Sequence, residues 1–265
     1  MSNKKKKVVV VLDNDECTGQ YVMASVFHSH IVNNYPDTTN KNSKNYQTLV
    51  KLFSDYYLKI NGVSPSKRNI GMVGCARPGT FFLLKLLHKY KEFGIVHKVV
   101  MYTSASNEDN WVYFLKDCLE EYAQAPGVFD LVFHRESFPN AKIAPSGATM
   151  KDLNNVFKHH TVNPKKLGKE NFKIIMLDDN PQNIKKSGPN NNVYQGLSAY
   201  HHMIGKNNLR KFIQILFDKF KIKDKRNFFQ EIIEDPDFNL TDNYEQSDDK
   251  EIIEFMKFLN KYIST

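Results

Sequence analysis

Cysteine is scarce in this sequence, and long apolar runs are missing from it. The only cysteines are Cys17, Cys75 and Cys118. Three scattered thiols are too few for a disulfide framework or a zinc site, which favours a reducing, intracellular environment, cytoplasmic or nuclear. The longest apolar runs, such as residues 8–12 and 174–177, are far shorter than the roughly 20 residues of a membrane-spanning helix. We therefore expect a soluble protein with no membrane partner.

The amino-terminal residues do not have the pattern of a secretory leader. Lysines at positions 4–7 precede the apolar run, but that run leads directly into Asp13 without a small-residue cleavage site. The formal net charge is +8. Because the lysines are spread along the whole chain, this charge favours acidic or phosphorylated substrates in general, and nucleic acid stays open only as a weakly supported partner.

Strand-like and helical patterns alternate along the chain. Apolar, β-branched-rich runs predict strands at 8–12, 70–76, 96–102, 129–133, 172–177 and 193–195. Apolar residues at helical spacing predict helices at about 80–93, 107–122 and 206–220. Repeated β/α units are typical of an α/β fold, and we predict a Rossmann-like core with a central parallel sheet and helices on both faces.

Two segments fall outside this alternation. Residues 20–67 interrupt it between the first strand and the rest, and we interpret them as a small insertion rather than a large cap. After residue 220 the chain becomes acidic at 234–249 and then forms an amphipathic helical pattern at 250–262. We predict a core at 1–220 with the insertion at about 20–67, and a helical and acidic extension at 221–265 packed on that core.

Polar side chains follow three of the predicted strands. In chain order these are Asp13 and Asp15, then Thr103 and Ser104, then Asp178 and Asp179. The carboxyl ends of strands in an open α/β sheet converge on one crevice. The sequence therefore predicts a functional site built from these side chains.

These residue types suit attack on a phosphate ester. A carboxylate nucleophile needs a cation to hold it against the phosphoryl oxygens, and Mg²⁺ prefers a site with one or two carboxylates and several waters. Asp13 and Asp178 can supply those carboxylates. Asp15 lies two residues further on and points to the same side of an extended strand, where it can protonate the leaving oxygen and later activate water. Thr103 and a lysine can stabilise charge on the transferring phosphoryl group.

Several short motifs resemble, in order, those of the haloacid dehalogenase superfamily, and most closely the RNA polymerase II carboxy-terminal-domain phosphatases and their NLI-interacting-factor-like relatives. The motifs are Leu12-Asp13-Asn14-Asp15-Glu16, Arg77-Pro78-Gly79, Tyr102-Thr103-Ser104-Ala105-Ser106, Phe133-His134-Arg135-Glu136-Ser137, Lys151-Asp152-Leu153 and Leu177-Asp178-Asp179-Asn180-Pro181. The resemblance covers about residues 7–220, without much of 20–67.

The resemblance implies a Mg²⁺-dependent phosphatase that hydrolyses phosphomonoesters through an aspartyl-phosphate on Asp13. Asp15 would be the general acid and base, and Lys151 would offset charge on the phosphoryl group and the nucleophile. The implied phosphate-binding residues are Thr103, Ser104, Lys151 and Arg135. The implied metal site consists of Asp13, the backbone carbonyl of Asp15, Asp178, and Asp179 directly or through water.

Some alternatives stay open at this point. Arg135 is equally consistent with a surface salt bridge, and Lys142 is a second candidate for the role of Lys151. The family commonly has threonine where this chain has Cys17. The expected substrate is phosphoserine or phosphothreonine in a protein. The rivals are phosphorylated nucleic-acid ends or small metabolites, and an inactive binding module that keeps the fold.

Overall fold

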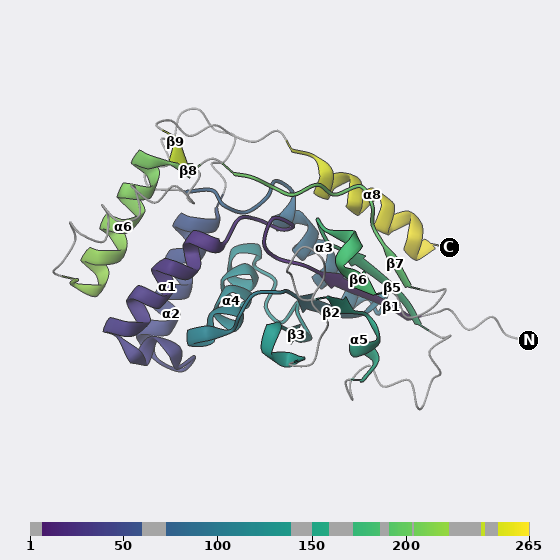
Figure 1. Cartoon of the computed structure of the whole chain (residues 1–265), viewed down its shortest axis with the longest axis horizontal. Coiled ribbons are helices and arrows are strands. Elements are labelled where there is room, and N and C mark those ends of the chain that lie inside the picture. Colours follow the sequence, from purple (N-terminus) through teal and green to yellow (C-terminus); the bar gives the residue numbers. More distant parts are fainter. Residues whose placement is uncertain are drawn as a thin grey trace, which may run out of the picture.

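The computed structural model describes residues 7–59, 73–138, 150–158, 172–185, 191–202, 204–222, 240–241 and 249–264. Within them, a five-stranded parallel sheet is flanked by helices (Figure 1). Its strands, in spatial order, are β3 (Leu131–Phe133), β2 (Val96–Tyr102), β1 (Lys7–Leu12), β5 (Phe172–Leu177) and β7 (Asn191–Val193). The predicted α/β fold with a central parallel sheet is confirmed.

Helices and short strands complete the described structure. The longer helices are α1 (Val22–Asn34), α2 (Lys44–Leu52), α3 (Thr80–Glu92), α4 (Trp111–Ala123), α6 (Lys206–Phe220) and α8 (Glu251–Ser264). Shorter helical segments are η1 (Pro36–Thr39), η2 (Phe53–Leu58), η3 (Glu108–Asn110), η4 (Arg135–Ser137), α5 (Asn154–Lys158) and η8 (Pro181–Asn183). Two-stranded parallel pairs join β4 (Lys151–Asp152) to β6 (Ile184–Lys185), and β8 (Ile204–Gly205) to β9 (Leu240–Thr241).

The central strand β1 is buried on both faces of the sheet. Val8, Val10 and Leu12 belong to one hydrophobic cluster, while Val9 and Val11 belong to a second. This division follows from the two-residue period of a strand, and continuous apolar runs are typical of strands with both faces covered. Because β1 pairs with both β2 and β5, it places its own carboxyl end between theirs.

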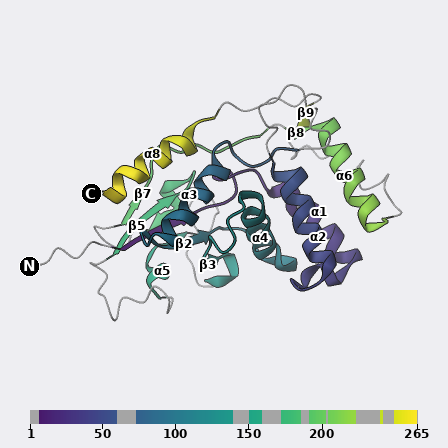
Figure 2. The same ribbon diagram turned by 180° about the vertical axis from the view of Figure 1, so that it is seen from behind.

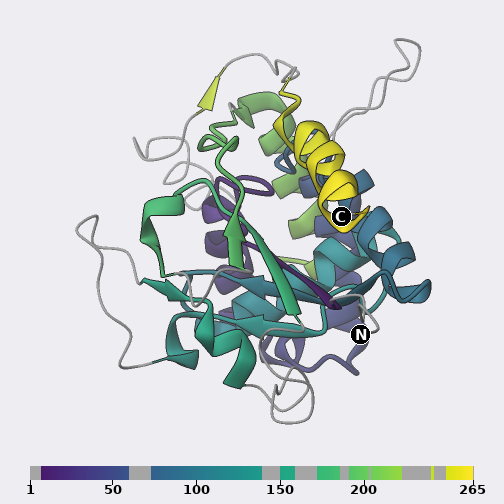
Figure 3. The same cartoon turned by 90° about the vertical axis from the view of Figure 1, so that its right-hand side faces the viewer.

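The two faces of the sheet carry unequal helical layers. The larger cluster contains the buried faces of α1, α3, α4, α6 and α8, whereas the smaller one contains Val156 of α5. Figure 3 shows α8 and α5 on opposite sides of the strands. Four apolar side chains of α8, from Ile252 to Ile263, are buried in the larger cluster, so this helix packs on the rest of the molecule.

The expected insertion forms an aromatic helical layer together with α6. Figure 2 shows α1, α2 and α6 at the end of the molecule away from β5 and β7. The ring centroid of Phe212 on α6 lies 5.7 Å from that of Phe27 on α1. It lies 5.4 Å from the ring centroid of Phe53 and 5.3 Å from that of Tyr57, both on η2. The described part of the chain therefore has an extra layer beside the sheet and no large cap above it.

The predicted strand at 70–76 is wrong for its described residues. Residues 73–75 are not in a strand, and Ala76 makes only an isolated bridge to Gly19. The amides of Val73 and Cys75 donate to the carbonyls of Tyr56 and Tyr57 instead. The π-helical turn η2 leaves carbonyls open at its carboxyl end, and this apolar segment satisfies them. The strand predicted at 193–195 lies slightly earlier, at Asn191–Val193.

Among the described residues, Arg77 has the largest fully buried side chain. Its Nη1 donates to the carbonyls of Glu16 and Cys17, both at 3.3 Å, in the loop after β1. Its Nε donates to Asp249 at 2.9 Å and its Nη2 to Glu251 at 2.7 Å. One guanidinium group therefore joins the loop after β1 to the start of α8, and we call this set of contacts the Arg77 clamp.

None of the described helices has the length and apolar composition that crossing a lipid bilayer would require.

Substituting Arg77 tests the clamp. Arg77→Met leaves two partly buried carboxylates without their cation and three carbonyls, those of Glu16, Cys17 and Ser198, without this donor. We therefore expect the unfolding free energy to fall by about 3–5 kcal/mol. Urea denaturation measures this change. Lys89→Met, on an exposed lysine of α3, is the control and should stay within about 0.5 kcal/mol of wild type. Equal stability of the two variants would contradict the structural role of the clamp.

Candidate functional site

Asp13 and Asp178 lie side by side where β1 and β5 end. The two strands pair in register, with Leu12 opposite Leu177, and each aspartate is the next residue. The amide of Asp13 donates to the carbonyl of Leu177 at 3.0 Å. Both carboxylates are buried, with 6% of Asp13 and 1% of Asp178 exposed. Parallel pairing is thus the local cause of their proximity.

Lys151 connects these two carboxylates. It lies on β4, which pairs with β6 shortly after the end of β5. Its Nζ lies 2.8 Å from Asp13 Oδ1 and 2.6 Å from Asp178 Oδ2. Of the many lysines in the chain, the structure thus brings Lys151 to the predicted position. Lys142, the second candidate, lies outside the described residues.

Burial and mutual repulsion dominate the electrostatics of this cluster. Burial raises the pKa of Asp13 to about 6, although the neighbouring Lys151 acts in the opposite direction. Burial and the charge of Asp13 raise the pKa of Asp178 to about 6. Burial lowers the pKa of the Lys151 ammonium, but the two aspartates outweigh this effect and hold it above its usual value. The site therefore favours additional positive charge.

A divalent cation fits this arrangement. Asp13, Asp178 and Asp179 each offer a carboxylate oxygen, and these oxygens lie within 4.8 Å of one another. Hard oxygen donors of this kind suit Mg²⁺. When all three carboxylates are ionised, Lys151 balances one of the three negative charges, and a divalent cation would balance the other two.

Asp15 lies at the edge of this cluster. Its Oδ1 accepts a hydrogen bond from the amide of Tyr21 at 3.2 Å. Burial raises its pKa to about 6, against the effect of that hydrogen bond. Its carboxylate is not one of the three that converge on the candidate metal position, which is consistent with a role in proton transfer rather than ligation by its side chain.

The loop after Asp13 is a tight turn tied to β5. The carbonyl of Asn14 accepts from the amides of Cys17 and Thr18 at 3.1 and 2.8 Å. The Cys17 thiol is buried and donates to the carbonyl of Leu177 at 3.6 Å. Cysteine at this position therefore still anchors the loop through its side chain.

The three other predicted phosphate-binding residues follow β2 and β3, which lie on the side of β1 opposite to β5. They are Thr103, Ser104 and Arg135. Thr103 directly follows β2, which pairs with β1, and it is buried. Its hydroxyl accepts from the amide of Ala105 at 3.1 Å. Arg135 is exposed, and its Nε donates to the carbonyl of Ser104 at 3.0 Å. Thr103 is thus placed at the strand ends, and Arg135 supports the loop that follows it.

A cavity of about 400 Å³ opens beside Asp15. Its lining residues come from that loop, from α1, from the segment between β2 and α4, and from the start of α4: Asp15, Val22, Ser25, Val26, His28, Ser29, Ala105, Ser106, Glu108, Asp109 and Trp111. We call this cavity the α1 cleft. Sequence reasoning missed it, because its residues belong to two segments that the fold, not the spacing, brings together.

His28 contributes a buried ring to the α1 cleft. Its side chain is 1% exposed and stacks on Phe114, with ring centroids 4.2 Å apart. Neither ring nitrogen has a hydrogen-bond partner among the described residues. Burial lowers the pKa of His28 to about 4, although the carboxylate of Asp109 acts in the opposite direction. The ring is therefore neutral at physiological pH.

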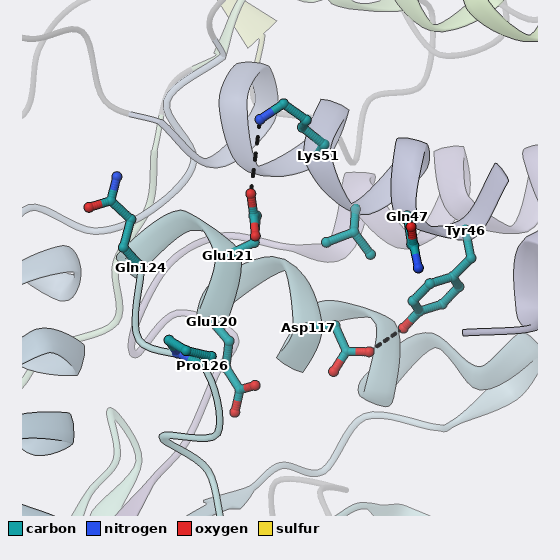
Figure 4. Close-up of a pocket in the computed structure, with 9 residues that line it drawn as sticks. Tyr46, Gln47, Lys51, Asp117, Glu120, Glu121, Gln124 and Pro126 are labelled. Carbon is teal, nitrogen blue, oxygen red and sulfur yellow. Dashed lines mark hydrogen bonds and ion pairs between the residues drawn. The ribbon is translucent and has the colours of Figure 1, made fainter. Parts of the chain in front are cut away.

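A larger cavity of about 590 Å³ lies between α2 and α4 (Figure 4). Several of its polar groups are paired with one another. The Tyr46 hydroxyl donates a hydrogen bond to Asp117 Oδ2 at 2.5 Å, and the Nζ of Lys51 lies 4.0 Å from Glu121 Oε1. None of the predicted site residues lines it, so the strand-end cluster remains the candidate site.

No protein-family model matches this chain, and no curated protein sequence matches it. Any function of this chain is therefore inferred from the geometry of the site and from the motifs themselves.

The pH dependence of stability tests the state of His28. Between about pH 6.5 and pH 4 the unfolded chain binds a proton at His28 that the folded chain does not, so the unfolding free energy falls as the pH falls through this range. The loss reaches about 3 kcal/mol, and no effect is expected above pH 6.5. Denaturant titrations of wild type and His28→Leu isolate this contribution as a difference. If the unfolding free energies of the two proteins changed with pH in parallel, the pKa of His28 would be the same in the folded and unfolded chains, which would contradict this prediction.

Proposed function

We propose that this chain is a Mg²⁺-dependent phosphomonoester hydrolase that acts through an aspartyl-phosphate on Asp13. The observation that carries the proposal is the convergence of Asp13, Lys151 and Asp178, which come from three separate segments. The Nζ of Lys151 lies 2.8 Å from Asp13 Oδ1 and 2.6 Å from Asp178 Oδ2. Structural ion pairs also perturb pKa values. Here, however, one lysine holds two buried carboxylates at the carboxyl ends of parallel strands, and a third carboxylate lies beside them, which suits a reaction rather than stability alone.

The reaction has two steps. In the first, a carboxylate oxygen of Asp13 attacks phosphorus and the ester oxygen departs with a proton from Asp15. In the second, Asp15 takes a proton from water, which attacks the phosphoryl group and releases inorganic phosphate and free Asp13. In this reaction Lys151 would stabilise negative charge at Asp13 and on the transferred group, and Thr103 would donate a hydrogen bond to that group.

Asp13, Asp178 and Asp179 would hold the metal ion, which when bound neutralises the phosphoryl oxygens and fixes them against the nucleophile. The backbone carbonyl of Asp15 follows from the family resemblance as a further ligand. The ordered motifs, from Leu12-Asp13-Asn14-Asp15-Glu16 to Leu177-Asp178-Asp179-Asn180-Pro181, support the proposal that the chain is a haloacid dehalogenase superfamily phosphatase similar to the carboxy-terminal-domain phosphatases.

Replacing the nucleophile should abolish turnover. We expect Asp13→Asn to lower kcat for an aryl phosphate by at least about a thousandfold, because an amide cannot form the intermediate. Chelation of divalent ions should remove wild-type turnover, and added Mg²⁺ should restore it. Asp55→Asn, a half-exposed acid of η2, is the matched control and should keep wild-type rates. Normal turnover of Asp13→Asn, or indifference to chelation, would refute this mechanism.

Substrate class is tested by direct comparison. We expect kcat/KM to be highest for phosphoserine or phosphothreonine peptides, and at least about tenfold lower for 3′- or 5′-phosphorylated oligonucleotides and for sugar phosphates. The formal net charge of +8 favours the oligonucleotide rival, so its higher turnover would replace a protein substrate with nucleic-acid ends. No turnover of any phosphoester with Mg²⁺ present would favour an inactive binding module.

A further inference from the structure

The α1 cleft begins at the proposed general acid. Asp15 lines the cleft and stands two residues after the proposed nucleophile Asp13. A phosphoester with its phosphorus at Asp13 and its leaving oxygen at Asp15 therefore has its leaving group beside the mouth of the cleft. Whatever is attached to that leaving group is the part of the substrate that can enter.

One wall of the cleft is apolar and exposed. Val22 and Val26 are one helical turn apart on α1, and both line the cleft. Their exposed fractions, 57% and 38%, are unusually large for valine in this chain, where most valines are buried. Ala105, in the segment before α4, and Trp111, the first residue of α4, extend the apolar surface. This wall suits a hydrocarbon chain.

The opposite wall carries carboxylates. Glu108 and Asp109 are exposed and line the cleft from η3. One oxygen of Asp109 accepts a hydrogen bond from Ser29 at 2.7 Å, which fixes the carboxylate toward α1. No lysine or arginine is present among the described residues that line the cleft. In a chain with a net charge of +8, this cavity is a local acidic site, and it would repel a phosphodiester backbone.

His28 adds an independent sign of a ligand. A buried imidazole without hydrogen-bond partners costs free energy that a folded protein normally avoids. Both ring nitrogens of His28 lack a partner among the described residues, and the ring lines the cleft. A bound chain that offers a backbone amide or carbonyl would satisfy one of them.

We propose that the α1 cleft binds a lysine or arginine side chain of a protein substrate, close in sequence to the phosphorylated residue. The aliphatic stem would lie on Val22 and Val26, and the charged end would reach Glu108 and Asp109, as long basic side chains commonly do when apolar and acidic groups are adjacent. His28 would bind the substrate backbone. This specificity rests on the proposed phosphatase function of Asp13, and it deepens that function by naming the substrate as a basic phosphopeptide.

Steady-state kinetics on phosphoserine peptides test this assignment. Each peptide has an alanine background and one lysine at one of the three positions on either side of the phosphoserine, with norleucine at the same position as the uncharged match. At the best position we expect lysine to give roughly three- to tenfold higher kcat/KM than norleucine. The ratio should fall below about twofold in the double variant Glu108→Gln/Asp109→Asn. Asparagine tolerates the left-handed backbone of Asp109, whose φ is 51°.

A matched control removes two charges elsewhere. Glu92→Gln/Glu121→Gln changes two exposed acids, at the end of α3 and on α4, and it should keep the wild-type ratio. A ratio near one at every position in the wild type would overturn the assignment, as would equal loss in both double variants, because the preference would then reflect net charge and not the cleft.

Tryptophan fluorescence separates this assignment from the phosphatase mechanism. Trp111 is the only tryptophan of the chain and lines the cleft. A non-hydrolysable phosphonate peptide with the best lysine position should change its emission more than the norleucine match does, whether or not turnover occurs. If aryl phosphate is hydrolysed but the two peptides give equal emission changes, the cleft assignment fails alone. If aryl phosphate is not hydrolysed but the lysine peptide binds, the mechanism fails and the basic-peptide site stands. Competition for this signal by a 5′-phosphorylated oligonucleotide would assign the cleft to nucleic acid instead.

Discussion

The Lys151 ammonium between Asp13 and Asp178 is the interaction on which the site depends. Two buried carboxylates at adjacent strand ends repel each other, and burying them without a counter-charge would cost several kcal/mol. The Lys151 ammonium supplies this counter-charge, because its Nζ lies 2.8 Å from a carboxylate oxygen of Asp13 and 2.6 Å from one of Asp178. The short pairing of β4 with β6 brings this lysine to the ends of β1 and β5. The sheet supplies the carboxylates, and this small element supplies the charge that makes their burial tolerable.

The charge distribution around the strand ends is uneven. The Lys151 ammonium contacts Asp13, which is where the proposed reaction would hold the phosphoryl group. Acidic side chains line the neighbouring α1 cleft. A substrate with a phosphate and a nearby basic group matches both halves of this pattern. A polyanion matches only the first half, and this local arrangement outweighs the net charge of +8, because charges spread over a surface are screened by salt while those in a cavity are screened much less.

Periodicity in the sequence was sufficient where local pattern decides structure. Strand 96–102 and helix 206–220 were predicted with the bounds of β2 and α6. The apolar run at 70–76 was misread, because its amides pair with the end of η2 and not with a strand. Asp13, Lys151 and Asp178 were predicted as members of one site, and the structure brings them together. The partners of Arg77 and the α1 cleft were not predictable, since both join segments whose contact depends on the whole fold.

The Arg77 clamp has a consequence for the order in which the molecule is completed. Glu16, Cys17 and Arg77 leave the ribosome early, but the carboxylates that neutralise this guanidinium, at Asp249 and Glu251, are translated more than 170 residues after Arg77. A nascent chain can pair its early strands, yet burying Arg77 without those acids would leave an uncompensated charge. We therefore expect the loop that carries Asp15 to reach its final geometry late in synthesis, once those two acids have been translated.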